Sequence, residues 1–169
     1  MVKLVKHTEK HIEPLVKLLN NDNISRWLIN VPYPYTLEKA KEWIEICNEM
    51  EDGKDYGFAI ELDGKLIGGI GMNVDGRRDA GLDDHKAQIG YWLGEDYWGK
   101  GYMTDALRQV LKLAFDELKL VRVYAYTHEG NTASENVLLR NGFEHEGFIK
   151  KGFKKGDKLF NSNLYAKVI

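Results

Sequence analysis

Residues 89–107 read IGYWLGEDYWGKGYMTDAL and join the end of a predicted strand to the start of a predicted helix. Gly99 and Gly101 stand on either side of Lys100 where that helix begins. Glycines at such a point let the backbone turn so that several N–H groups face one concavity, and the helix N-terminus adds a partial positive charge. The arrangement suits a pyrophosphate, but a lone G-x-G is more often structural, and Lys100 is equally able to face solvent.

Two common nucleotide-binding patterns do not fit this loop. The dinucleotide fingerprint requires a third glycine where Thr104 stands. The Walker pattern requires serine or threonine directly after Gly-Lys, where Gly101 stands. The loop by itself therefore does not identify its ligand.

A second block follows the next predicted strand and reads NTASENVLLRNGF, residues 131–143. Asn131 and Ser134 open a short predicted helix, which Asn141-Gly142 ends in the manner of a glycine C-cap. In this order and spacing, the two blocks resemble the GCN5-related N-acetyltransferase (GNAT) superfamily, and their wording resembles its RimJ/RimL-type ribosomal-protein branch. The stretch SRWLINVPYPYTLEKAKEWI (25–44) and the closing hairpin are also similar to that branch, so the resemblance covers nearly the whole chain.

The resemblance implies an acetyl-CoA-dependent N-acetyltransferase that passes the acetyl group directly to an amine and uses no metal. In this family the loop before the long helix holds the CoA pyrophosphate through backbone amides, and an asparagine bonds the pantetheine arm. Carried onto this chain, the implied cofactor-binding residues are Leu93, Trp98, Gly99, Lys100, Gly101, Tyr102, Met103, Thr104, Asn131 and Asn136.

The same resemblance implies how the reacting atoms are held. Backbone N–H groups of Tyr91, Trp92 and Leu93, at the end of a splayed strand, would bind the acetyl carbonyl and the pantetheine. Ser134 would donate a hydrogen bond to the departing sulfur, because Leu138 stands where many relatives have a tyrosine. The implied catalytic residues are thus Ser134, Tyr91 and Trp92.

Structural explanations of these residues stay open at this point. Asn131 and Ser134 are also residues that commonly begin a helix. The aromatic residues around Trp92 and Trp98 are equally suited to a hydrophobic core.

The chain lacks the acidic residue that the resemblance implies as the base for removing the acceptor's proton. An acidic residue often stands two positions before the strand glycine in this branch, but here Gln88 does, and an amide takes no proton. Deprotonation at pH 7 costs about 1.4 kcal/mol for an α-amine with a pKa near 8, but about 4.6 kcal/mol for a lysine or polyamine amine. We therefore favour a low-pKa acceptor such as a protein N-terminus. Asp84 and His85 are nearby alternative bases, though a loop histidine is more often solvated.

Acceptor binding is the least determined part. The aromatic stretch 27–35 and the acidic loop 75–84 either wall a pocket for a cationic amine or cap the sheet and face water. The candidate substrate-binding residues are Trp27, Tyr33, Tyr35 and His85. The lysines of the closing hairpin (150–158) are typical of a solvated turn more than of a nucleic-acid contact.

Composition limits the class of protein. The chain has 169 residues, 43% hydrophobic and 30% charged, with a net charge of −2, as expected for one soluble domain over residues 1–169 without affinity for nucleic acid or membrane. One cysteine, Cys47, allows no internal disulfide, and the polar N-terminus is no signal peptide. We expect a cytoplasmic protein and leave a homodimer open.

Periodicity predicts a mixed α+β order, and the resemblance refines it to the GNAT acyl-CoA N-acyltransferase fold, a mostly antiparallel, splayed sheet flanked by helices. Asp63-Gly64 predicts a tight hairpin. The final strand either pairs with a partner or closes the sheet. The expected helices are 9–20, 36–50, 102–118 and 132–140, and the expected strands are 1–5, 56–62, 65–74, 87–93, 121–127, 143–153 and 159–168.

Other functions remain for the chain as read from its sequence. The acceptor could be a small amine, such as a polyamine, an amino acid or an antibiotic. Gln88 and Leu138 also leave room for a CoA-binding regulator without catalysis.

Overall fold

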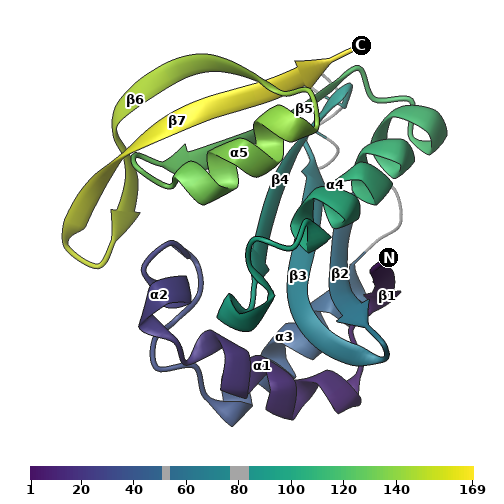
Figure 1. The fold of residues 1–169 in the computed structure, drawn as a ribbon, viewed down its shortest axis with the longest axis vertical. Helices are drawn as coiled ribbons and strands as arrows, with labels where there is room; N and C mark the ends of the chain where they lie inside the picture. Colours follow the sequence, from purple (N-terminus) through teal and green to yellow (C-terminus); the bar gives the residue numbers. More distant parts are fainter. Residues whose placement is uncertain (51–53, 77–83) are drawn as a thin grey trace.

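The computed structural model describes residues 1–50, 54–76 and 84–169 and is built around a seven-stranded sheet (Figure 1). The strand order is β1-β2-β3-β4-β5-β7-β6, and every neighbouring pair is antiparallel except β4 with β5. The predicted fold class, α+β with a mostly antiparallel sheet, is confirmed. The strands are β1 (Lys3–Lys6), β2 (Asp55–Leu62), β3 (Lys65–Val74), β4 (Lys86–Leu93), β5 (Arg122–His128), β6 (Glu144–Lys155) and β7 (Lys158–Val168).

Helices cover both faces of the sheet. One core layer packs α4 and α5 against it, and a second layer packs α1 and α3 against the opposite face of its first strands. Thr36 accepts a hydrogen bond from the Lys39 N–H and caps α3, as predicted. The helical segments are η1 (Glu9–His11), α1 (Ile12–Leu19), α2 (Asp22–Ser25), α3 (Leu37–Glu49), η2 (Glu95–Tyr97), α4 (Tyr102–Lys112), the π-helical η3 (Leu113–Glu117) and α5 (Thr132–Arg140).

The tight hairpin between β2 and β3 forms where the sequence predicted it. Asp63 and Gly64 both have positive φ, at 49° and 77°. Aspartate and glycine tolerate this backbone conformation better than most residues, and it matches the twist of the two strands.

The two parallel strands at the centre of the sheet part from one another. β4 pairs with β5 only from Lys86 to Gln88, whose partner is Tyr124. β4 nevertheless continues to pair with β3 as far as Leu93, and β5 with β7 as far as His128. The predicted splay is therefore present, and the sheet opens beyond Gln88 and Tyr124.

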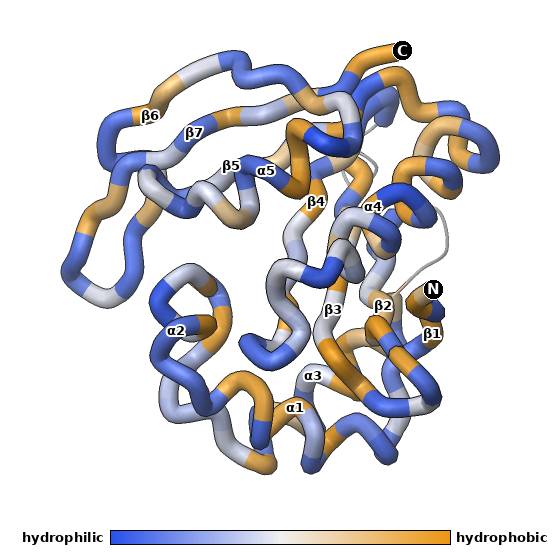
Figure 2. Tube along the Cα trace, in the orientation of Figure 1, coloured by the Kyte–Doolittle hydropathy of each residue, from blue (hydrophilic) through white to orange (hydrophobic). Residues whose placement is uncertain are grey.

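The last two strands form a long hairpin that reaches across to α2 (Figure 1). β7 lies inside the sheet, between β5 and β6, so the final strand closes the domain's own sheet. The tip is hydrophilic (Figure 2), yet Lys155 Nζ donates hydrogen bonds to the Ser25 and Leu28 carbonyls at 2.7 and 2.8 Å. The hairpin is thereby fastened to the end of α2 and the segment that follows it.

Within residues 1–50, 54–76 and 84–169, the structure contains no helix with the length and apolar character needed to cross a membrane.

Candidate functional site

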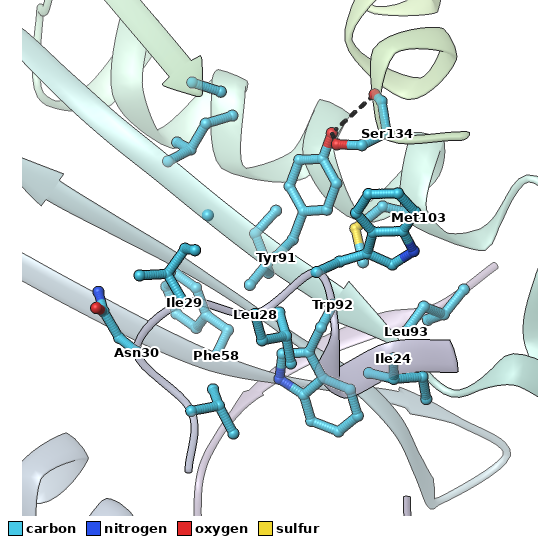
Figure 3. Close-up of a pocket in the computed structure, with 18 of the residues that line it drawn as sticks. Ile24, Leu28, Ile29, Asn30, Phe58, Tyr91, Trp92, Leu93, Met103 and Ser134 are labelled. Carbon is cyan, nitrogen blue, oxygen red and sulfur yellow. Dashed lines mark hydrogen bonds between the residues drawn. The ribbon is translucent and has the colours of Figure 1, made fainter. Parts of the chain in front are cut away.

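A cleft of about 1350 Å³ opens where β4 and β5 part (Figure 3). Residues of the glycine loop and the first turn of α4 line one end of it. The start of α5, the end of β5 and the segment after α2 line the rest. The two sequence blocks singled out above thus meet at one cavity.

Backbone alternation along β4 decides which amides face the opening. The Gly94 N–H donates to the Ile67 carbonyl of β3 at 2.8 Å. Because N–H direction alternates along a strand, Trp92 also directs its backbone groups toward β3, whereas Tyr91 and Leu93 direct theirs toward the gap. This geometry corrects the expectation for Trp92, whose amide cannot serve the gap.

The end of β4 is braced by the loop that follows it. Trp98 Nε1 donates to the Leu93 carbonyl at 2.7 Å. The Leu93 carbonyl is thus already hydrogen-bonded to the indole, and this bond fixes the strand end against the loop. The Leu93 N–H remains directed toward the gap.

The glycine loop has the backbone shape that phosphate binding needs. Gly99 and Gly101 have φ of 71° and 80°, and no atom lies within 4 Å of a Cβ built at either position. Gly101 caps α4, so Tyr102, Met103 and Thr104 form the first turn of a helix whose amides point into the loop. The two glycines and the three residues of the first turn all line the cleft, whereas Lys100 between the glycines is not among its described lining residues.

The Lys100 side chain is exposed, but its amino group bonds to the protein's own backbone. Its Nζ donates to the Asp96 carbonyl at 2.7 Å and lies 6.0 Å from the centre of the Tyr97 ring. The side chain is thus folded back on η2, and Lys100 is not among the described residues that line the cleft.

Asn131 and Ser134 combine a structural and a site position. Asn131 Oδ1 accepts from the Ser134 N–H at 3.3 Å and caps α5, which is the structural explanation left open above. The Ser134 hydroxyl lies 3.0 Å from the Tyr91 hydroxyl, inside the cleft. Asn136 also lines the cleft, while Leu138 is fully buried behind it.

Gly71 and Gly90 form part of the floor of the cleft, on the face of the sheet that carries α3. Gly57, Gly71 and Gly90 lie side by side on β2, β3 and β4. A Cβ at Gly90 would meet no atom within 4 Å, so this part of the floor is open. At Gly57 a Cβ would come within 3.0 Å of Cys47 Sγ, because α3 packs there.

A row of polar side chains borders this floor. Asp55, Asn73 and Gln88 are aligned across the same three strands. Each lies two residues from the glycine of its own strand. Asn73 Nδ2 donates to Asp55 Oδ1 at 2.6 Å, and all three residues line the cleft. Sequence reasoning found Gln88 but missed Asp55 and Asn73, since strand register was not available to it.

The candidate acceptor-binding residues separate into two groups. Trp27 and Tyr35 line the cleft. Tyr33, which is 51% exposed, and His85 are not among its described lining residues. The acidic loop 77–83 lies outside the described residues, and Asp75 beside it accepts a hydrogen bond from the Tyr124 hydroxyl at 2.8 Å.

His128 is a cleft residue that the sequence did not reveal. It is buried at the end of β5, with ring centres of Trp27 and Phe153 at 5.8 and 4.8 Å, and its Nε2 has no hydrogen-bond partner among the described residues. Burial, followed by the nearby charge of Lys155, lowers the pKa of His128. The only sequence signal was alternation, which places it on the same face as Tyr126.

Among the described residues, no group of three or more histidine, cysteine, aspartate or glutamate side chains is placed to hold a metal ion.

Comparisons with known proteins agree with this geometry. Residues 2–144 match the family described as acetyltransferase (GNAT) domain. A ribosomal-protein-serine acetyltransferase of Escherichia coli (strain K12) is 31% identical over 166 residues, covering 95% of this chain and 89% of that protein.

Two solved structures share the fold. A microcin C7 self-immunity acetyltransferase, MccE, in complex with acetyl-CoA and AMP, has a TM-score of 0.86 at 24% identity over 99% of this chain and 92% of that one. RimL, a ribosomal L7/L12 alpha-N-protein acetyltransferase in complex with coenzyme A, has a TM-score of 0.84 at 24% identity over 99% and 94%. The chain therefore belongs to the GNAT family and is an acetyl-CoA-dependent N-acetyltransferase of the RimJ/RimL-like branch.

Proposed function

We propose that the enzyme acetylates the α-amine of a protein N-terminus. The observation that carries this proposal is Gln88 on β4, which borders the open glycine floor where a carboxylate base would be expected. An amide side chain cannot accept a proton, so an acceptor that is already partly deprotonated at neutral pH suits the site better than a lysine or polyamine nitrogen.

The side of the cleft next to α4 and α5 would hold acetyl-CoA. Backbone amides from Trp98 to Met103 would bind the pyrophosphate. The Tyr91 N–H, facing the gap, would stabilise the carbonyl oxygen as it gains charge, and the Leu93 N–H would bind the pantetheine arm. Asn131 would contact the pantetheine amides, and Ser134 would donate a hydrogen bond to the departing sulfur.

The opposite side of the cleft leaves room for an extended chain end. Because Gly71 and Gly90 have no side chains, a peptide can approach the sheet closely beside Gln88. A cavity of about 1350 Å³ exceeds the roughly 300–1,000 Å³ of most small-ligand pockets, as expected where two substrates bind together.

Direct transfer fits the chemistry of the single cysteine. Burial raises the pKa of the Cys47 thiol to about 12, so the thiol stays protonated and is a weak nucleophile. Cys47 packs on Gly57 and is not among the described lining residues. A covalent acetyl-cysteine intermediate is therefore not part of the proposal.

The relatives support this acceptor class without deciding it. The E. coli relative is named for acetylating a ribosomal protein, and this chain aligns with 89% of its length. We extend that acceptor class to this chain as part of the proposal.

A small cationic amine is the second candidate. Glu42, Glu49 and Asp55 all line the cleft on the acceptor side, and carboxylates attract ammonium groups. Lys39 Nζ already pairs with Glu42 at 2.6 Å, which reduces the charge available there.

The deciding experiment measures thiol release from acetyl-CoA with three acceptors: a peptide with a free N-terminus, the same peptide with a blocked N-terminus, and a panel of polyamines. We expect turnover with the free peptide only, and kcat/KM that rises with pH toward the α-amine pKa near 8. Turnover with the polyamines alone would replace the proposal by the second candidate.

A further inference from the structure

The side chain of Tyr91 packs against the edge of the hydrophobic core and brings its hydroxyl to Ser134. Its hydroxyl oxygen is 3.0 Å from Ser134 Oγ and 3.1 Å from the Ser134 carbonyl oxygen. Figure 3 shows the ring extending from β4 to the first turn of α5 with its oxygen at this residue. The contact thus links the two elements that part around the cleft.

Counting protons shows that this contact has two arrangements. A phenol has one proton to donate, and a carbonyl oxygen can only accept. If Tyr91 donates to the Ser134 carbonyl, its oxygen can accept the Ser134 hydroxyl proton, which is then held by the phenol oxygen. If Tyr91 donates to Ser134 Oγ instead, the Ser134 proton is free to point elsewhere.

We propose that Tyr91, through its phenol, is a positioning residue that aims the Ser134 proton at the departing sulfur. In the transfer step the acceptor nitrogen forms a bond to the acetyl carbon, the carbon–sulfur bond breaks, and its electron pair stays on sulfur. Ser134 donates a hydrogen bond to that sulfur, and Tyr91 turns its own hydrogen bond from the Ser134 carbonyl to Oγ. The proton lost by the amine passes to water, and sulfur later takes one from water.

Donation to Ser134 Oγ also strengthens the Ser134 hydroxyl as a donor, since linked hydrogen bonds polarise one another. Burial raises the pKa of the Tyr91 phenol, so it keeps its proton at neutral pH. Leu138 supplies no hydroxyl one turn further along α5, whereas Ser134 has the Tyr91 phenol within hydrogen-bond distance. The inference rests on the role proposed above for Ser134, but not on the identity of the acceptor.

A double-mutant cycle tests it with Tyr91→Phe, Ser134→Ala and the double variant, under single turnover with any amine that supports transfer. We expect Tyr91→Phe to lower the transfer rate about tenfold, in line with the loss of one hydrogen bond of about 1.4 kcal/mol. In the Ser134→Ala background the same change should have less than about a twofold effect, because the phenol acts through Ser134. The Kd for CoA should stay within about twofold of wild type. The ratio of the wild-type transfer rate to the Tyr91→Phe transfer rate should not vary between pH 6 and 9.

Two results would overturn the inference. If the two substitutions multiply their effects, Tyr91 does not act through Ser134. If Tyr91→Phe raises the Kd for CoA while the transfer rate at saturation is unchanged, the phenol only braces α5 against β4. Tyr165→Phe, a buried tyrosine on β7 that is not among the described lining residues, is the matched control and should leave both quantities unchanged. Failure of peptide acceptors would overturn the proposed acceptor and leave this cycle measurable with another amine.

Discussion

The two sides of the cleft are built in different ways. The side next to α4 and α5 comes from two short stretches of sequence, residues 89–107 and 131–143, whose local conformation already shapes it. The acceptor side combines the segment after α2, α3, β2 and β3, which follow one another in the chain, with Phe153 of the closing hairpin, which lies far from them in sequence. The first side is therefore set by backbone geometry, and the second by which side chains the fold brings together.

This difference predicts where substitutions act. A change in the glycine loop should disturb CoA binding with little effect on the choice of acceptor. A change on the acceptor side should alter the choice of amine or its KM and leave CoA affinity intact. Four substitutions test this separation.

The largest effect is expected for Gly101→Ala. Alanine is strained at a φ of 80°, and relief of that strain would turn the loop amides away from the pyrophosphate. The Kd for CoA, measured by calorimetry, should rise by roughly 10- to 100-fold, as 1–3 kcal/mol of strain implies. Gly64→Ala carries the same type of strain at a φ of 77° in the β2–β3 turn, and equal loss of CoA affinity there would show a general effect of folding.

Gln88→Glu is next and tests the acceptor side. A carboxylate beside the open floor can take the proton of a strongly basic amine, so kcat/KM for polyamines at pH 7 should rise about tenfold relative to the N-terminal peptide. The Kd for CoA should not change. Gln88→Met removes the amide without adding a base, and a similar gain in that variant would contradict the explanation.

Trp98→Phe should have a smaller effect, on the CoA side. It removes the hydrogen bond to the Leu93 carbonyl but keeps an aromatic ring at the position. Loosening of the strand end should raise the KM for acetyl-CoA about fivefold, the size expected for one neutral hydrogen bond. An unchanged KM for acetyl-CoA would show that the loop does not need this brace.

The smallest effect is expected for Lys155→Met. Its two hydrogen bonds fasten the hairpin to the segment after α2, and their loss should raise the acceptor KM about threefold while CoA affinity stays the same. Lys158→Met, an exposed lysine of the same hairpin, is the control. Equal changes of the acceptor KM in the two variants would point to net charge rather than to the two hydrogen bonds of Lys155.

The contrast between the two sides also explains what the sequence could predict. The longer helices, the strands, the Asp63-Gly64 turn and the turning of the backbone at Gly99 and Gly101 are local and were predicted, whereas the short helices α2 and η2 were not. The mostly antiparallel sheet and the parting of β4 from its neighbour came from the resemblance. Asp55 could not be placed, because only the β2–β3 register sets it beside Asn73.

Long-range contacts account for the remaining gaps. His128 enters the cleft because Phe153 and Phe160 from the hairpin pack around it. Trp92 was expected to offer its amide, but strand alternation directs that amide to β3. No sequence pattern distinguishes adjacent residues of one strand in this way until a neighbouring strand is fixed.

The parting of β4 from β5 also has a consequence for hydrogen exchange. Amides held in a continuous ladder exchange only when the structure opens, whereas the Tyr91 and Leu93 amides face a gap and need no such opening. A substrate that bonds to them closes the ladder and stabilises the folded protein by mass action. These two amides should therefore exchange quickly in the free enzyme and become protected with acetyl-CoA, so that the sheet is completed by its own substrate.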